Sequence, residues 1–264
     1  MIGVQQDKEL DSENQAIFLD ELKKIDLTIT NYENLKQKID LIFVINYNKI
    51  IDVNKINHFI INLHIGLLPK YRGNSANAWA VINGEKKVGY TIHEISKDLD
   101  SGDIYYKYEY SILNDSNYLP AKESINNDII NNIEKTLIKV INGDLKPVSQ
   151  NEKEFMYCTK LRPSFGVIKN WNFTTDYFLR KMYVFSPPLG TGLKFEFNNK
   201  EFRIEQLSCV KSFADSIGVV GAIVYIKDNS LWVKTKDNVI SIDKLTHAGK
   251  KVLMNEEFKI GQIL

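Results

Sequence analysis

The 264-residue sequence is poor in the residues that build disulfide or metal frameworks. Its two cysteines, Cys158 and Cys209, are too few and too far apart for a metal-binding knuckle. It contains no Gly-x-Gly-x-x-Gly segment, Walker loop or metal-ligand signature, so neither a nicotinamide cofactor nor a bound metal is predicted. No apolar run approaches the ~20 residues that span a membrane, and the first residues are not those of an export signal. We therefore expect a cytoplasmic protein with reduced thiols and no membrane partner.

A strong excess of charge of one sign is also absent, since the formal net charge is +1. The charge is nevertheless uneven, with acidic residues in excess over 1–157 and basic residues in excess over 158–264. A basic C-terminal region suits RNA or an anionic small molecule, but it also arises where lysines alternate along strands as solvent-facing residues, and we favour this second interpretation. The length and the 44% hydrophobic content fit a globular protein of two domains.

Strand and helix signals alternate through the first half of the chain. Residues 41–46 and 59–63 are continuous apolar runs typical of strands buried on both faces. Residues 125–141 carry one apolar helical face that ends at Asn142-Gly143. This alternation predicts an α/β fold, with a Rossmann-like, mainly parallel sheet in an N-terminal domain over residues 1–150. The alternating tyrosines of 104–111 are more typical of an antiparallel or edge strand.

The second half changes character after a polar segment over 147–157, which is interpreted as a linker. A helix is predicted after Thr174 as its N-cap. Short alternating strands separated by turns then follow between residues 194 and 242. They predict a small, OB-like β-barrel in a C-terminal domain over residues 158–264.

An amide, an imidazole and a carboxylate stand near the ends of predicted strands. Asn62 and His64 close the apolar run 59–63, and Asp100 follows a strand predicted over 89–95. If both strand ends open on one side of the sheet, where open α/β sheets bind ligands, the three side chains meet. The amide then holds an oxyanion, the imidazole moves a proton and the carboxylate orients the imidazole. This set indicates acyl transfer to an amine.

Two further polar residues are open to interpretation. His93 lies inside a predicted strand and is interpreted as a packed or solvent-facing residue rather than a ligand. Arg72 either binds a phosphate or carboxylate or forms a local ion pair, and the sequence does not decide between them.

Three motifs in this region carry a family resemblance. Asn62-Leu63-His64, Leu68-Pro69-Lys70-Tyr71-Arg72-Gly73 and Leu99-Asp100-Ser101-Gly102 resemble, in order, the signature of the 10-formyltetrahydrofolate-dependent formyltransferases. These include methionyl-tRNA formyltransferase and the amino-sugar N-formyltransferases, and the chain after residue 160 is similar to their C-terminal barrel domain. The resemblance implies a formyltransferase that takes its formyl group from 10-formyltetrahydrofolate.

The resemblance also assigns roles to residues. It implies that Asn62, a protonated His64 and Asp100 are catalytic. It places seven residues at the pterin of the folate: Lys49, Ile50, Ile51, Ser96, Lys97, Asp98 and Leu99. The substrate is expected near Tyr71, Arg72 and Asn74, and Asn74 stands where some sugar enzymes have an arginine.

The beginning of the chain departs from the family pattern. Family members begin with a strand and helix that precede the position matched by Met1–Val4, and this unit is absent here. The expectation is a shortened form or a start assigned late, with a central strand missing from the sheet.

The segment after Met1–Val4 bears on the substrate. The tRNA-directed enzymes carry a basic loop there, whereas this chain has QQDKELDSENQ, which would repel a phosphate backbone. The sequence therefore favours a primary amine on a nucleotide-linked amino-dideoxysugar, destined for a surface glycan, over tRNA. Methionyl-tRNA formyltransferase activity and a catalytically impaired, truncated paralogue remain alternatives, and a homodimer is left open.

Overall fold

The structure is a computed structural model that describes residues 2–5, 28–29, 41–45, 51–55, 58–112, 118–210 and 218–264. The chain divides into two compact units, the first of which extends to residue 160, whereas the second contains 161–264 and two short pieces of the preceding chain. The first unit therefore continues beyond the boundary predicted at residue 150. Within the described residues no helix has the length and apolar character needed to cross a membrane.

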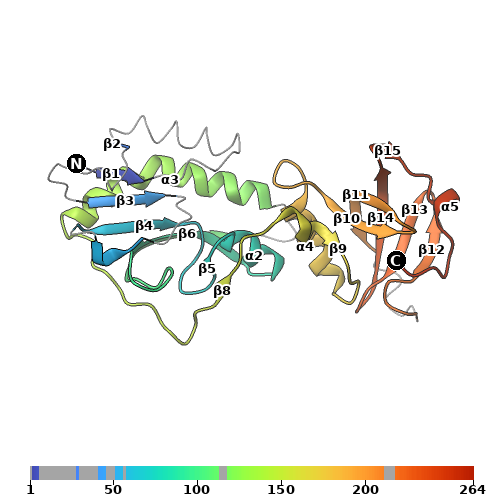
Figure 1. Cartoon of the computed structure of the whole chain (residues 1–264), viewed down its shortest axis with the longest axis horizontal. Helices are drawn as coiled ribbons and strands as arrows, with labels where there is room; N and C mark the ends of the chain where they lie inside the picture. Colours follow the sequence, from blue (N-terminus) through green and yellow to red (C-terminus); the bar gives the residue numbers. More distant parts are fainter. Residues whose placement is uncertain are drawn as a thin grey trace. The chain divides into compact units, whose positions relative to one another are not determined.

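A six-stranded sheet forms the centre of the first unit (Figure 1). Up to residue 160 the described elements are β1 (Ile2–Gln5), β2 (Thr28–Ile29), β3 (Leu41–Ile45), η2 (Val53–Lys55), β4 (Ile60–His64), β5 (Arg72–Gly73), α2 (Ala76–Ile82), β6 (Lys87–Glu94), β7 (Ile104–Ser111), α3 (Tyr118–Ile141) and β8 (Tyr157–Cys158). The strand order is β2-β1-β3-β4-β6-β7. The first four strands are parallel, but β6 is antiparallel to β4 and β7 is antiparallel to β6. The sheet is thus mixed, and the antiparallel edge strand predicted over 104–111 is confirmed.

The sheet has no gap where a central strand was expected to be missing. β1 pairs directly with β3 along its whole length, with Gly3 opposite Ile42 and Val4 opposite Phe43. The ladder groups of β3 on that side are therefore satisfied by β1. All five residues of β3 are buried, as the continuous apolar run predicts.

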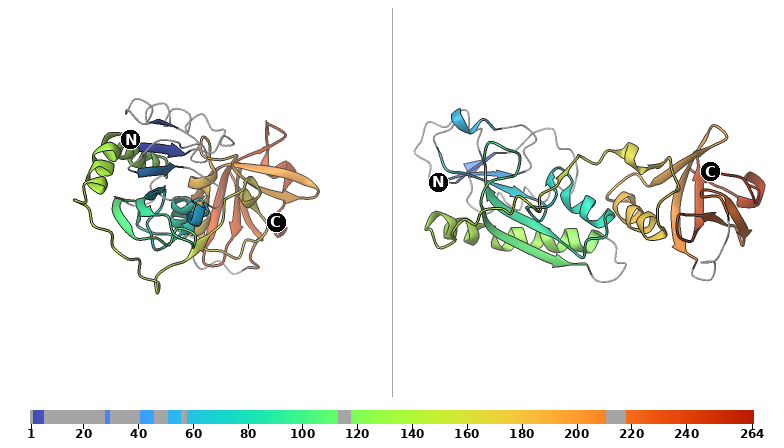
Figure 2. Two further views of the ribbon diagram at one scale, coloured as in Figure 1. Left: turned by 60° about the vertical axis from the view of Figure 1, so that its left-hand side comes forward. Right: turned by 90° about the horizontal axis from the view of Figure 1, so that it is seen from below.

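Helix α3 covers one face of this sheet. Figures 1 and 2 show the helix running along the strands. The five residues of its predicted apolar face are all at most 5% exposed: Ile125, Ile129, Ile133, Leu137 and Val140. Tyr90 on β6 donates a hydrogen bond to Asp128 on the helix at 2.8 Å. Because side chains alternate along a strand, the residues next to Tyr90 in β6 point away from α3, to the opposite face.

The second unit is built on an open sheet rather than a closed barrel. Its described elements are η3 (Pro163–Gly166), β9 (Val167–Ile168), α4 (Thr175–Phe185), β10 (Leu193–Phe197), β11 (Lys200–Cys209), β12 (Ile223–Lys227), β13 (Ser230–Lys234), β14 (Val239–His247), β15 (Lys250–Lys251) and α5 (Met254–Glu257). The order is β12-β13-β14-β11-β10-β9, and in the described part of the chain no ladder joins β12 to β9. The OB-like barrel is therefore not confirmed.

Local sequence signals explain the framework of this unit. Thr174 caps α4, as predicted, by accepting a hydrogen bond from the Tyr177 N–H at 3.3 Å. Asn198 and Asn199 both have positive φ in the two-residue turn between β10 and β11, the conformation of a type I′ hairpin. A register shift in the pairing of β11 with β14 bends the sheet, and Figure 2 shows the strands of this unit twisting across one another. Phe178, Phe195 and Phe202 pack inside at no more than 1% exposure.

The polar segment interpreted as a linker is bound to the first unit. Val148 exchanges two backbone hydrogen bonds with Ile104, at 2.8 and 2.9 Å. Further along, β8 pairs in parallel with β5, with Arg72 opposite Tyr157. We call residues 148–158 the strap, because both of its ends are hydrogen-bonded to the sheet strands of the first unit.

Candidate active site

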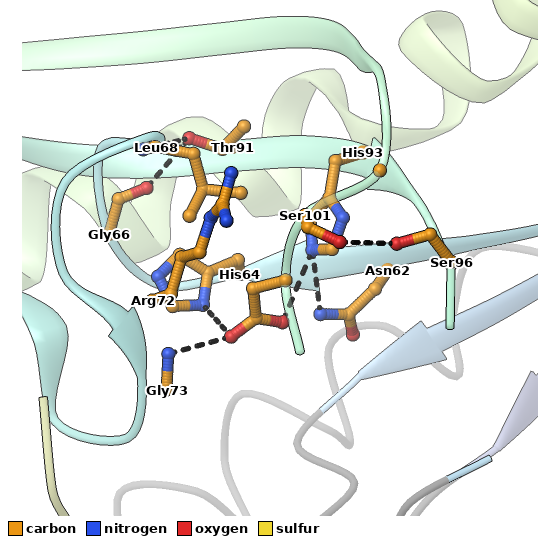
Figure 3. A network of polar contacts seen from close by, with 12 residues as sticks. Asn62, His64, Gly66, Leu68, Arg72, Gly73, Thr91, His93, Ser96 and Ser101 are labelled. Atoms are coloured by element: carbon orange, nitrogen blue, oxygen red, sulfur yellow. Dashed lines mark hydrogen bonds and ion pairs between the residues drawn. The ribbon is translucent and has the colours of Figure 1, made fainter. Parts of the chain in front are cut away.

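The candidate site lies on the sheet face opposite α3. Asn62 and His64 are two residues apart on β4, so strand alternation puts both side chains on one face. In the register with β6, Asn62 is opposite His93 and His64 is opposite Thr91. Figure 3 shows Asn62, His64 and His93 gathered on this face of the two strands.

Asp100 reaches this face by a route that the sequence argument did not predict. The sequence favoured β4 and the next strand ending on the same side, but β6 is antiparallel and ends beside Ile60 and Ile61. The chain then turns back over residues 96–103, and the Glu94 N–H donates to the Asp103 carbonyl at 2.9 Å. As a result Asp100 Oδ2 lies 3.4 Å from His64 Nδ1, and Asp100 Oδ1 lies 3.5 Å from His93 Nε2. The three predicted residues therefore converge, although through a different geometry.

The tautomer of His64 follows from its neighbours. Its Nε2 lies 3.0 Å from the backbone carbonyl of Tyr71, and a carbonyl can only accept, so Nε2 carries the hydrogen. In the neutral ring Nδ1 is then the unprotonated nitrogen, and it faces Asp100. The ring is 5% exposed. It also requires glycine at position 66, where a Cβ would overlap Ala76 and lie 2.7 Å from His64 Nε2.

The charge state of His64 differs from the sequence-based expectation. Burial lowers the pKa of His64, and His93 adds to this effect, so that against the opposing effects of Asp100 and the Tyr71 carbonyl the pKa falls to about 4. This shift favours a neutral His64 at neutral pH over the protonated ring expected from the sequence. Burial would raise the pKa of Asp100, but its contacts with His93 and His64 and the hydrogen bond from the Gly73 N–H together lower it. A neutral His64 thus faces the carboxylate of Asp100, and the pair can take up one proton between them.

His93 belongs to this site, although the sequence interpretation set it aside. It is 1% exposed, and its Nδ1 donates to the Glu94 carbonyl at 2.8 Å. In the neutral ring Nε2 then accepts from Asn62 Nδ2 at 3.2 Å. An amide nitrogen has two hydrogens, so Asn62 retains a second one that can donate to an oxyanion. The signal that could have identified His93 is its place opposite Asn62, which requires the antiparallel register of β6.

The residues expected at the substrate differ in their surroundings. Tyr71 is buried and in the left-handed region, and its carbonyl accepts hydrogen bonds from His64 and from Cys158 Sγ. Arg72 is 2% exposed and forms an ion pair with Glu152 at 2.6 Å, which favours the local ion pair of its two alternatives. Asn74 is exposed, and its carbonyl accepts from Cys158 Sγ at 3.1 Å. Burial and Asp100 raise the pKa of Cys158 to about 11, which suits a thiol that donates.

The residues expected at the pterin are described only in part. Lys49 and Ile50 lie outside the described residues. Ile51 packs in an apolar cluster with Ile42, Val44 and Ile60. In the loop after β6, Ser96 and Ser101 both donate to the Asp98 carbonyl, at 3.2 and 2.9 Å, and Lys97, Asp98 and Leu99 are exposed. The loop is thus held by hydrogen bonds from its own serine hydroxyls to its own backbone, and the side chains of residues 97–99 remain exposed.

Comparisons with known proteins identify the family. Residues 26–141 match the formyl transferase domain and residues 160–262 match the formyl transferase C-terminal domain. Methionyl-tRNA formyltransferase of Clostridium acetobutylicum is 30% identical over 223 residues, which cover 83% of this chain and 70% of that protein.

Solved structures share the fold. The N-formyltransferase from Helicobacter canadensis, in complex with folinic acid and dTDP-3-aminofucose, has a TM-score of 0.65 at 16% identity and covers 95% of this chain and 99% of its own. Methionyl-tRNA formyltransferase from Clostridium thermocellum has a TM-score of 0.58 at 16% identity, and the match covers 78% of this chain and 92% of that protein. With both domains matched in order and a curated relative at 30% identity, the chain belongs to the formyltransferase family.

Proposed function

We propose that this formyltransferase moves a formyl group from 10-formyltetrahydrofolate to the primary amine of a nucleotide-linked amino-dideoxysugar. The observation that carries the formyl transfer is the convergence of Asn62, His64 and Asp100 on one sheet face, with His64 as a neutral base. The folate supplies an activated formyl carbon. It is a fitting donor because the loop 96–99 offers exposed side chains and backbone to a flat ring, and because the solved relative holds a folate.

The residues divide the chemistry between them. As the amine nitrogen bonds to the formyl carbon, Asn62 Nδ2 donates its second hydrogen to the developing oxyanion. His64 Nδ1, supported by Asp100, takes the proton that leaves the amine nitrogen. When the bond from the formyl carbon to the folate nitrogen breaks, the protonated pair returns a proton to that nitrogen. The pair therefore ends the cycle as it began.

The choice of a sugar acceptor rests on the acidic segment that follows Val4 and on the likeness to a sugar enzyme along nearly the whole chain. After Gln5 the segment lies outside the described residues, and its acidic sequence is what favours the sugar. The curated relatives favour the second candidate, formylation of methionyl-tRNA.

The test is formyl transfer by the purified protein from 10-formyltetrahydrofolate to a panel of nucleotide-linked amino sugars and to methionyl initiator tRNA. We expect turnover with a sugar at a kcat/KM about 100-fold or more above that with tRNA, a ratio well within ordinary enzyme specificity. Asn62→Ala serves as the site control and should abolish most of that turnover. Preferred formylation of the tRNA would overturn the sugar assignment, and no transfer to any acceptor would support the impaired paralogue.

A further inference from the structure

The carboxylate of Asp100 is held from a loop rather than from a strand. Asp100 itself has a φ of 50°, in the left-handed region that few residues other than glycine adopt. The loop closes on itself through Ser96, Ser101 and Asp98. These bonds fix the tip of the loop, but they leave the backbone of Asp100 to be fixed from elsewhere.

Gln150 supplies that support from the strap. Its Nε2 donates to the Asp100 carbonyl at 2.8 Å and to the Gly102 carbonyl at 2.8 Å. One NH₂ group has two hydrogens, so a single side chain can hold both carbonyls on either side of Ser101. The contact joins residues 48 and 50 positions apart in the chain.

The orientation of the Gln150 amide is determined by Arg72. Gln150 Oε1 accepts from Arg72 Nε at 3.2 Å and from Nη2 at 2.8 Å. A guanidinium only donates and a carbonyl only accepts, so the amide fits in one orientation, with its oxygen toward Arg72 and its nitrogen toward the loop. Arg72 is itself fixed by Glu152 and by the ring of Phe155, whose centroid lies 4.8 Å from the guanidinium carbon.

The same two-residue strand holds the other end of Asp100. β5 provides the Arg72 side chain to Gln150 and the Gly73 N–H to Asp100 Oδ2, at 2.8 Å. Gly73 has a φ of 107°, and a Cβ there would overlap the Cys158 carbonyl of the strap. Thus β5 fixes the carboxylate directly and the backbone of Asp100 through Gln150.

From these contacts we propose that Gln150 is a positioning residue for formyl transfer. Its amide sets the direction of the Asp100 carboxylate toward His64 and His93, and the strap is part of the catalytic apparatus. This inference rests on the proposed function. A displacement of about 1 Å in a catalytic group can cost about 100-fold in rate, so the loss of two hydrogen bonds to the loop should act on turnover rather than on binding of the acceptor.

The test is Gln150→Glu, which keeps the shape and the acceptor for Arg72 but replaces both donors by an oxygen. The matched control is Gln206→Glu, the same amide-to-carboxylate change at an exposed residue of β11, outside the strap. We expect kcat to fall by about 100-fold in Gln150→Glu, with the KM for the acceptor within about threefold, and both constants to stay within about twofold in the control. The uncharged Gln150→Met, which lacks both polar functions, should show the same split between kcat and KM.

A second measurement needs no substrate and separates this inference from the proposed function. The Gly73 amide donates to Asp100 Oδ2, so its hydrogen exchange, followed by NMR, reports whether the carboxylate stays in place. We expect exchange at Gly73 to accelerate about 10-fold or more in Gln150→Glu and Gln150→Met, and to be unchanged in Gln206→Glu. Wild-type kcat and wild-type exchange in both Gln150 variants would overturn the proposal. Faster exchange in these variants of a protein that formylates no acceptor would support the positioning of Asp100 by Gln150. It would reject only the proposed function.

Discussion

At the scale of single residues, backbone carbonyls determine what the histidines of the site can do. The Tyr71 carbonyl directs the hydrogen of His64 to Nε2, and the Glu94 carbonyl directs that of His93 to Nδ1. The nitrogens left over, His64 Nδ1 and His93 Nε2, both face Asp100. Two side chains of one type therefore take different positions around one carboxylate, and neither role is visible in the residue type alone.

The buried His64 should make stability depend on pH. Its pKa falls from 6.5 to about 4 on folding, so between these pH values the unfolded chain binds a proton here and the folded chain does not. The free energy of unfolding should therefore decrease as the pH falls from 6.5 to 4, by about 3 kcal/mol from this group. Urea unfolding at pH 7 and at pH 5 should show about 2 kcal/mol of this decrease. His64→Asn should reduce this pH dependence and the surface variant His247→Asn should keep it, whereas equal slopes in all three proteins would contradict the assignment.

His93 should matter for turnover through Asn62. His93→Gln removes the ring nitrogen that accepts from Asn62 Nδ2, so the amide loses the contact that orients it. We expect kcat to fall about 10-fold, with a smaller change in the KM for the acceptor, because an oxyanion donor acts mainly in the transition state. Steady-state kinetics beside His247→Gln check this. A His93→Gln enzyme with wild-type kcat would return His93 to a packing role.

At the scale of elements, the two faces of the central sheet differ in composition, since one is apolar and the other carries polar side chains. α3 covers one face with isoleucine and leucine, while β4 and β6 present Asn62, His64 and His93 on the other. The strap adds a third component, because it joins β5 and β7 near the site. The helix packs the core on one face, and the opposite face holds the candidate site.

The two sides of α3 offer a test of this division. Ile129 is 0% exposed and Ile138 is 46% exposed on the same helix. Ile129→Ala should lower the free energy of unfolding by about 3 kcal/mol, because it leaves a cavity in the core. Ile138→Ala should change it by less than about 0.5 kcal/mol. Chemical denaturation of both variants checks the prediction, and similar losses in the two would show that the helix packs differently.

The elements that the sequence predicted well are those with a strong local signal. The apolar face of α3 and the Thr174 cap were predicted because helical spacing and capping chemistry act within a few residues. The direction of β6 was not predictable in this way, because a strand of either direction has the same alternation. Because the direction of β6 was unknown, the place of His93 opposite Asn62 was not predicted, and the path by which Asp100 reaches His64 was predicted wrongly. The strap was misread for a related reason, since Gln150 looks like any polar linker residue until Arg72 and the loop are placed around it.

At the scale of the whole molecule, the chain combines two units of different construction. The first unit is built on a mixed sheet in which β1 pairs directly with β3. This unit contains every residue of the candidate site. The second is an open, mainly antiparallel sheet around buried phenylalanines, where a closed barrel was expected from the short alternating strands. Alternation predicts strands, but closure depends on pairing between strands far apart in the sequence, which the pattern of one strand does not contain.

The pairing of Asn62 with His93 also makes the protein sensitive to the length of β4. Deletion of one residue within this strand would rotate every later side chain of the strand by half a turn. Isoleucine would then enter the reaction space, and the imidazole would be pressed against the helix. A deletion of one codon in β4 would therefore impair folding and activity together. A change of length in the loop 96–103 would impair catalysis alone.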